Sequence, residues 1–324
     1  MSKIIIGIHG LGNKPPKTIL TDWWKKSILD GLKKYNYSIT DFEFDLVYWA
    51  DILHPIPLDP DEVNKNNPLY LKNKYLSEQT LISNESPGLR KKAREYFEKF
   101  YGKIVVSEVL SLKYPSLTDL FFHLNMRDLE NYYLPFYVNH NGARSLAKQV
   151  IIERLSETLK KHKGKKILLI SHSMGSIITH DALMDNLPDL KINTLVSIGS
   201  PLGQKYVLRK TLEAQKNNSD NKLKVPENIQ RNWYNLSDLD DKVALNHLLA
   251  EIYVSNSKDV KIIDKLVQNN FDENGTRNPH SSYGYLRTPE CAEIVDSFLS
   301  HKKFSLFGWF RFTRSNKSPG SKSS

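Results

Sequence analysis

The most informative segment of this sequence is Ile167-Leu-Leu-Ile-Ser-His-Ser-Met-Gly-Ser176. Its first four residues are apolar, as in a strand that is buried on both faces of a sheet. A helical segment begins directly afterwards at Met174, so strand and helix are joined by a tight turn with Ser173 at its tip. So close an approach leaves room only for small residues two positions before and after the serine, and Ser171 and Gly175 occupy those positions.

The alternation of strands and helices extends outward from this turn in both directions. Toward the N-terminus we expect a strand over 3–8, a helix over 23–35 capped by Thr21 or Asp22, and a strand over 42–49. Toward the C-terminus we expect helices over 143–162, 174–184 and 288–300, and strands over 166–170, 193–198, 231–236 and 260–267. This order predicts an α/β fold with a mostly parallel, doubly wound sheet that carries helices on both faces.

The alternation stops for some ninety residues after Ala50, which indicates an insertion. Aromatic residues concentrate near its end, where they either line a pocket or pack the insertion onto the sheet. The predicted division is an α/β core over 1–50 and 141–301, a largely helical cap or lid over 51–140, and an aromatic and basic tail over 302–324 that we expect to be partly disordered.

The formal net charge of +10 is unevenly distributed along the chain. The tail over 302–324 holds six basic residues and no acidic ones, so the rest of the chain carries only four net charges, as an ordinary solvated surface does. This distribution argues against a nucleic-acid partner. The tail combines aromatic and cationic side chains, which leaves two alternatives: peripheral contact with a membrane, or docking of the aromatic end on the domain.

The single cysteine, Cys291, excludes an intramolecular disulfide framework and favours a reducing compartment. The apolar run before His9 is too short for a secretory signal, and no stretch reaches the ~18 apolar residues of a membrane-spanning helix. We therefore expect a cytoplasmic protein, with peripheral membrane contact through the tail as the alternative.

A serine at the tip of such a turn is a candidate nucleophile, although serine is also common as a helix N-cap. To react at neutral pH, Ser173 needs a histidine that accepts its proton and a carboxylate that orients the histidine. Where serine sits on a strand-to-helix turn, the acid and then the histidine follow it along the chain. The strand over 231–236 runs into a loop with three candidate acids, Asp238, Asp240 and Asp241.

The histidine expected from this chain order is His280, which follows the last predicted strand and precedes the final helix. His247, expected on a helix, is the alternative. His172 is expected to pack beside the turn, since adjacent side chains at a turn point apart, and His162 to lie on a lysine-rich surface.

A reaction at an acyl carbonyl also needs backbone N–H donors for the oxyanion. Met174 follows the candidate nucleophile and supplies one donor, and Leu11 in the loop His9-Gly10-Leu11-Gly12 supplies the other. The glycines of this loop do not form the Gly-x-Gly-x-x-Gly pattern of dinucleotide-binding loops, and no zinc-ligand motif occurs. We therefore expect neither a cofactor nor a metal.

Four sequence features together resemble the α/β-hydrolase superfamily, in particular its bacterial lipase-like and serine-esterase-like members. They are the loop over 9–12, the turn at Ser173, the segment Asp241-Lys-Val243 and the segment Asn278-Pro-His280. The resemblance covers residues 3–50 and 142–301, although family members usually carry glycine where this chain has Ser171.

This resemblance implies Ser173 as nucleophile, Asp241 as the preferred acid and His280 as base, acting on a small-molecule or lipid ester, with apolar acyl esters as the expected substrates. Two alternatives remain: an acyltransferase or thioesterase of the same fold, and a non-catalytic, membrane-associated binding or scaffold protein.

Overall fold

The computed structural model describes residues 1–77, 127–134, 137–138, 144–184, 190–214, 223–244, 246–273 and 275–300. Most of the predicted cap and the whole predicted tail over 302–324 therefore lie outside the described residues. The predicted sheet domain lies almost entirely within them.

A six-stranded sheet forms the centre of the molecule, in the order β10-β8-β6-β5-β1-β2. Every neighbouring pair is parallel, so the prediction of a mostly parallel α/β sheet is confirmed. The strands are β1 (Lys3–Ile8), β2 (Phe44–Val47), β5 (Lys166–His172), β6 (Ile192–Ile198), β8 (Ile229–Asp238) and β10 (Ile262–Val267).

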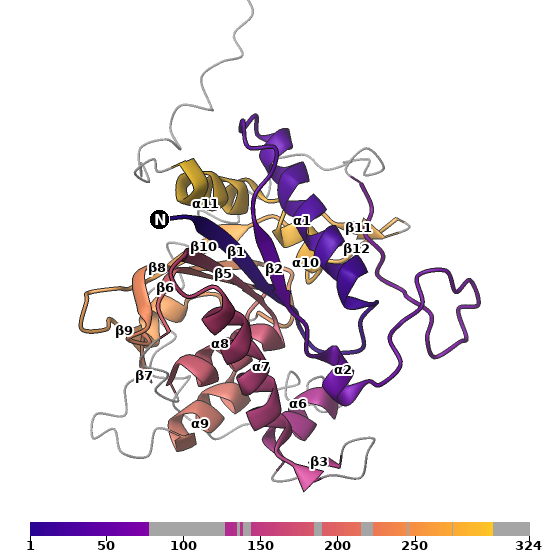
Figure 1. The fold of residues 1–324 in the computed structure, drawn as a ribbon, viewed down its shortest axis with the longest axis horizontal. Helices are drawn as coiled ribbons and strands as arrows, with labels where there is room; N and C mark the ends of the chain where they lie inside the picture. The colour runs from indigo at the N-terminus through magenta and orange to yellow at the C-terminus, as the bar shows by residue number, and fades with distance from the viewer. Residues whose placement is uncertain are drawn as a thin grey trace, which may run out of the picture.

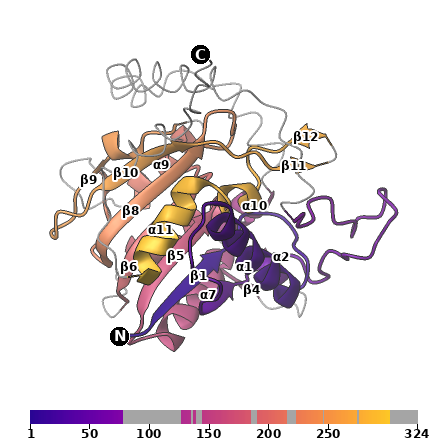
Figure 2. The same cartoon turned by 90° about the horizontal axis from the view of Figure 1, so that it is seen from above.

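Helices cover both faces of this sheet (Figure 1). On one face lie α1 (Lys17–Lys34), α10 (Ser282–Tyr285) and α11 (Pro289–Ser300), with α1 and α11 in contact in front of the strands (Figure 2). On the other face lie α6 (Arg127–Tyr133), α7 (Ala147–Lys161), α8 (Met174–Met184) and α9 (Lys205–Ala214).

Several short elements connect these layers. They are α2 (Ala50–Leu53), β3 (Tyr137–Val138), β4 (Arg144–Ser145), β7 (Leu223–Lys224), the 3₁₀ helix η3 (Leu249–Glu251), β9 (Tyr253–Val254), β11 (Asp272–Glu273) and β12 (Thr276–Arg277).

The two helical layers explain why the strands read as continuous apolar runs. In β1, Ile4, Ile6 and Ile8 pack into the core that includes α7 and α8, whereas Ile5 packs into the core that includes α1 and α11. Successive side chains of a strand point to opposite faces, so a strand covered on both faces needs apolar residues at consecutive positions.

The first helix begins earlier than the sequence prediction. α1 starts at Lys17 rather than near Trp23, and the predicted cap residue Thr21 lies inside it, where its hydroxyl donates to the Lys17 carbonyl. The reason is that the apolar stripe extends one turn further back, to Leu20, whose N–H donates to the carbonyl of Pro16. Proline before the first helical residue suits a helix start because it lacks an N–H that would need a partner.

His162 is also placed differently from its prediction. Its side chain is buried rather than displayed on a lysine-rich surface, and its Nε2 donates to the Asp45 carboxylate at 2.8 Å. The lysines that neighbour His162 in the sequence give no indication of this contact, because Asp45 lies 117 residues away on β2. Among the described helices, none combines the length and apolar composition needed to cross a bilayer.

Candidate active site

The turn after β5 has the backbone strain expected of it. Ser173 has φ +51°, in the left-handed region that L-residues seldom adopt, and its N–H donates to the Ile198 carbonyl at the end of β6. A Cβ atom at Gly175 would lie 2.7 Å from the carbonyl oxygens of Ile8 and His9. Helix α8 therefore starts so close to β1 that position 175 excludes any side chain.

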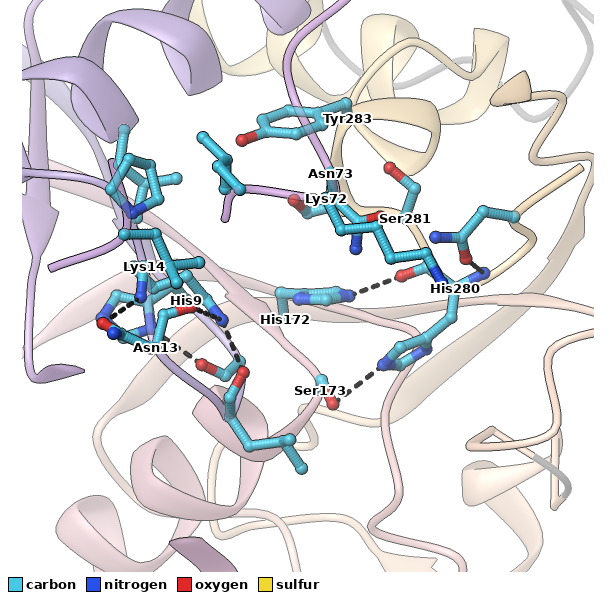
Figure 3. Close-up of a pocket in the computed structure, with 18 of the residues that line it drawn as sticks. His9, Asn13, Lys14, Lys72, Asn73, His172, Ser173, His280, Ser281 and Tyr283 are labelled. Atoms are coloured by element: carbon cyan, nitrogen blue, oxygen red, sulfur yellow. Dashed lines mark hydrogen bonds between the residues drawn. The ribbon is translucent and has the colours of Figure 1, made fainter. Parts of the chain in front are cut away.

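Ser173, His280 and Asp241 form a chain of hydrogen bonds. Ser173 Oγ lies 3.0 Å from His280 Nε2, and His280 Nδ1 lies 2.9 Å from Asp241 Oδ2. A carboxylate only accepts, so Nδ1 carries the imidazole proton and Nε2 accepts the serine proton. Figure 3 shows the Ser173 and His280 side chains pointing toward each other.

Asp241 is fully buried and receives several donors. Besides His280, its carboxylate accepts from the Tyr285 hydroxyl at 2.7 Å and from the Val243 N–H at 2.9 Å. Burial by itself would raise the pKa of Asp241, but the hydrogen bonds from His280 and Tyr285 outweigh burial and hold the pKa below its ordinary value. The carboxylate is therefore ionised and suited to orient the imidazole.

The other two candidate acids are directed to Arg277 instead. Asp238 Oδ2 lies 2.5 Å from Arg277 Nη2 and also accepts from the Asn269 N–H at 2.6 Å. Asp240 pairs with Nη1 of the same guanidinium. Asp238 and Asp240 thus hold the loop after β8 against the loop before α10, and only Asp241 among the three faces His280.

His172 contacts His280 through the backbone. Its Nε2 donates to the His280 carbonyl at 2.9 Å, and the two rings lie 4.8 Å apart. Burial, together with the nearby His280, lowers the pKa of His172 to about 3, so its ring is neutral. The sequence predicted packing beside the turn, and the structure adds a hydrogen bond that holds the segment carrying His280.

The alternative base, His247, is not on a helix. It lies in the irregular segment before η3, buried, and the Asn235 side chain donates to its carbonyl. Burial lowers the pKa of His247 to about 4. The helix predicted around it is absent because the described chain turns here toward η3 and β9.

The loop after β1 passes directly against the serine. A Cβ at Gly10 would lie 2.8 Å from Ser173 Cβ, so the backbone must approach the candidate nucleophile without a side chain. His9 stacks on Trp49 at 4.8 Å, donates from Nδ1 to the Gly10 carbonyl and accepts the Trp49 N–H at Nε2. Burial holds the pKa of His9 well below its ordinary value, so this histidine is a neutral support for the loop.

Three side chains that sequence reasoning missed also hold this loop. Asp128 Oδ2 accepts the Gly12 N–H at 2.6 Å, and His54 Nε2 donates to the same carboxylate at 3.0 Å. Lys14 Nζ donates to the carbonyl of Leu11 at 2.5 Å and to that of Gly12 at 3.0 Å. No local pattern marks Asp128 in the sequence, because it lies 116 residues from Gly12 within the predicted insertion.

These loops meet where the strand order reverses. The chain leaves β1 for β2 on one side and later returns to β5 on the other, so the carboxyl ends of β1 and β5 flank the reversal point. In open α/β sheets, ligands bind in the crevice at such a point. A pocket of about 370 Å³ opens here, and Ser173, His280 and His172 line it (Figure 3). Its lining also includes the apolar residues Leu20, Trp24 and Leu58.

Among the described residues, no group of three or more His, Cys, Asp or Glu side chains is arranged to hold a metal ion. No protein-family model matches the chain, and no curated protein matches it.

Proposed function

We propose that this protein is a serine hydrolase of the α/β-hydrolase type that cleaves carboxylic esters through an acyl-enzyme intermediate. The observation that carries the proposal is the continuous contact from Ser173 Oγ to His280 Nε2 at 3.0 Å and from His280 Nδ1 to Asp241 at 2.9 Å. Serine on a strained strand-to-helix turn, with acid and histidine following it along the chain, is the arrangement that activates serine in this class of enzyme.

In the acylation step, His280 Nε2 removes the proton of the Ser173 hydroxyl while Oγ forms a bond to the acyl carbon. The carbonyl π bond opens to give a tetrahedral oxyanion, and the imidazolium is stabilised by the ionised Asp241. The bond from the acyl carbon to the leaving oxygen then breaks, and His280 delivers its proton to the departing alcohol.

The oxyanion requires N–H donors that are already in place. Within the described residues, neither the Leu11 N–H nor the Met174 N–H donates to another protein group. Leu11 follows Gly10, whose backbone packs against Ser173, and Met174 is the first residue of α8. We assign the oxyanion site to these two amides.

In the deacylation step, His280 takes a proton from a water molecule, whose oxygen attacks the acyl carbon. The second tetrahedral intermediate collapses with release of the carboxylic acid, and the proton returns to Ser173 Oγ. No redox change occurs, and water supplies the only second reactant.

The substrate side of the proposal rests on the pocket. Four of the residues that line it, Leu20, Trp24, Leu58 and Leu71, are apolar, and we infer that they form an apolar wall that receives the acyl or alkyl group of the ester. Hydrolysis of p-nitrophenyl esters of increasing acyl length is expected to rise and then fall as this wall is filled. Equal rates for all chain lengths would show that the apolar wall does not contribute to substrate binding.

The decisive experiment is labelling with a fluorophosphonate probe, which phosphonylates an activated serine. Wild type should be labelled, and Ser173→Ala and His280→Ala should not be. Ser282→Ala is the matched control, because Ser282 lines the same pocket without belonging to the hydrogen-bonded chain, and it should be labelled like wild type. Labelling of Ser173→Ala equal to that of wild type would show that another residue is the nucleophile. Absence of labelling in wild type would favour a non-catalytic protein.

A further inference from the structure

Helix α6 lies outside the alternation of strands and helices but is firmly attached to the sheet domain. Leu129 and Tyr132 are buried in the core that includes α7 and α8. The Tyr132 hydroxyl donates to Asp181 Oδ2 at 3.0 Å, and Lys148 Nζ lies 2.6 Å from the same oxygen. Any side chain that α6 directs toward the sheet edge is therefore held on a rigid support.

Asp128 is the side chain that α6 presents to the loop after β1. It is 5 % exposed, and its two oxygens lie 3.0 and 3.1 Å from His54 Nε2 while Oδ2 accepts the Gly12 N–H at 2.6 Å. Burial favours the neutral acid, but the contacts with His54 and Gly12 outweigh it and lower the pKa of Asp128, so the group is an anion. A charged acceptor makes a stronger hydrogen bond to a backbone N–H than a neutral one does.

Lys14 restrains the same loop from the carbonyl side. Its Nζ donates to the carbonyls of Leu11, Gly12 and Asn13 at 2.5, 3.0 and 3.4 Å. Gly12 has φ +84°, so the chain turns sharply at this residue. Asp128 accepts its N–H, and Lys14 donates to its carbonyl. With these groups occupied, the Leu11 N–H still donates to no other described group and is free to meet a ligand.

We propose that Asp128 is a positioning residue of the active site: by holding the Gly12 N–H it fixes the turn that presents the Leu11 N–H to the oxyanion. This inference rests on the proposed function. It assigns to a segment of the predicted insertion a defined role in transition-state stabilisation. Asp128 contacts no reacting atom, and its effect passes through the backbone of Gly12 and Leu11.

The test is substitution of Asp128 in the full-length protein. Loss of one oxyanion donor reduces kcat by about 10²- to 10³-fold in a serine hydrolase, and a misplaced donor is expected to lie toward the lower end of that range. Asp128→Ala should therefore lower kcat by about a hundredfold with KM changed less than about threefold. Asp128→Asn keeps an oxygen that can accept the Gly12 N–H and should lose only about tenfold.

A second readout separates positioning from a loss of stability. A trifluoromethyl ketone analogue of the best ester forms a tetrahedral adduct whose oxygen occupies the oxyanion site, so its affinity depends on the Leu11 N–H. Its Ki should rise in Asp128→Ala by the same factor by which kcat/KM falls. A role confined to stability would lower Tm and leave both the Ki and kcat of the folded protein unchanged.

Asp45→Asn is the matched control. Like Asp128, Asp45 accepts from one histidine, His162, and from one backbone N–H, that of Leu46, but it lies on β2 away from the carboxyl edge of the sheet. This variant should lose stability comparably and keep kcat and the analogue Ki within about twofold of wild type. Should Asp128→Ala fail to fold, Asp128→Asn is judged by the same two readouts.

The outcomes are distinguishable. Parallel losses in kcat/KM and analogue affinity, specific to the Asp128 variants, support the inference. If wild type is labelled at Ser173 but the Asp128 variants retain kcat and analogue affinity, the inference about Asp128 is wrong and the proposed function stands. A wild type that no serine-directed probe labels overturns the proposed function, and the role assigned to Asp128 with it.

Discussion

His172 donates from its ring Nε2 to the backbone carbonyl of His280 at 2.9 Å. The residue beside the candidate nucleophile thus holds the backbone of the candidate base, although the two lie 108 positions apart. Because the pKa of His172 lies near 3 and its imidazole is therefore neutral, this bond does not depend on pH across the physiological range. It restrains the distance between β5 and the segment before α10, on which the contact from Ser173 to His280 depends.

Removal of this bond should weaken catalysis without abolishing it. His172→Ala is expected to lower kcat by roughly tenfold, since a buried hydrogen bond contributes about 1–1.5 kcal/mol and its loss lets the His280 segment move. His172→Gln can donate an amide N–H to the same carbonyl and should retain more of the activity. Steady-state kinetics with a p-nitrophenyl ester would measure both, and a His172→Ala enzyme with wild-type kcat would exclude this role.

Asp241→Asn should have a far larger effect on kcat than substitution of its neighbour Asp240. An amide at 241 no longer selects the Nδ1–H tautomer or stabilises the imidazolium, and a loss of roughly 10³- to 10⁴-fold is expected, as for the corresponding change in other serine hydrolases. Asp240→Asn removes a carboxylate that pairs with Arg277 and should keep kcat within about threefold. Comparable losses in the two variants would contradict the assignment of Asp241 as the orienting acid.

Gly199 is expected to be required for catalysis as well as for the backbone conformation of its turn. It has φ +55°, and a Cβ there would lie 2.9 Å from Asp241 Oδ2 and 3.1 Å from His280 Nδ1. Gly199→Ala is therefore expected to lower stability by about 1–2 kcal/mol from backbone strain and to reduce kcat by displacing these groups.

Gly164→Ala isolates the contribution of backbone strain. Gly164 has φ +97°, and a Cβ there would meet nothing within 4 Å. Thermal denaturation should show the larger loss of stability for Gly199→Ala, because its methyl group adds steric contacts to the backbone strain, and ester hydrolysis should fall only in that variant. Full activity in both would mean that the site accommodates a methyl group at 199.

Activity and stability should respond oppositely to alkaline pH. Burial lowers the pKa of Lys14 to about 8, although the facing carboxylate of Asp128 raises it. Above pH 8 the ammonium loses a proton and binds the carbonyls of the oxyanion loop more weakly, so kcat/KM should fall. The folded state then binds fewer protons at Lys14 than the unfolded state does, so this group's contribution makes the protein more stable from about pH 8 to 10.5.

The pH profile of kcat/KM beside that of the free energy of unfolding would check this prediction. Lys14→Gln should have lower activity at pH 7 and no decline centred near pH 8, because it lacks the titrating group. If the alkaline decline in kcat/KM persists unchanged in Lys14→Gln, the titrating group is another residue.

The local features of this protein follow from its amino-acid sequence. Apolar runs specified the strands because both faces of the sheet are covered, and the small residue at 175 specified the turn that carries Ser173 because nothing larger fits against β1. The order of segments along the chain also placed His280 after the last strand of the sheet. The start of α1 and the end of β8 were less accurate, since the apolar pattern blurs at the ends of elements.

How the loops meet depends on the packing of the whole sheet domain. The residues alone offered three candidate acids, Asp238, Asp240 and Asp241, and only a family resemblance favoured Asp241. Their different contacts depend on Arg277 and Tyr285, which follow β10 in the chain. Asp128 reaches Gly12 across 116 residues, and no periodic pattern records such a contact. The physical reason is that periodicity reflects which face of an element is buried, whereas the partner of a buried polar group is set by whichever distant loop the packed sheet places beside it.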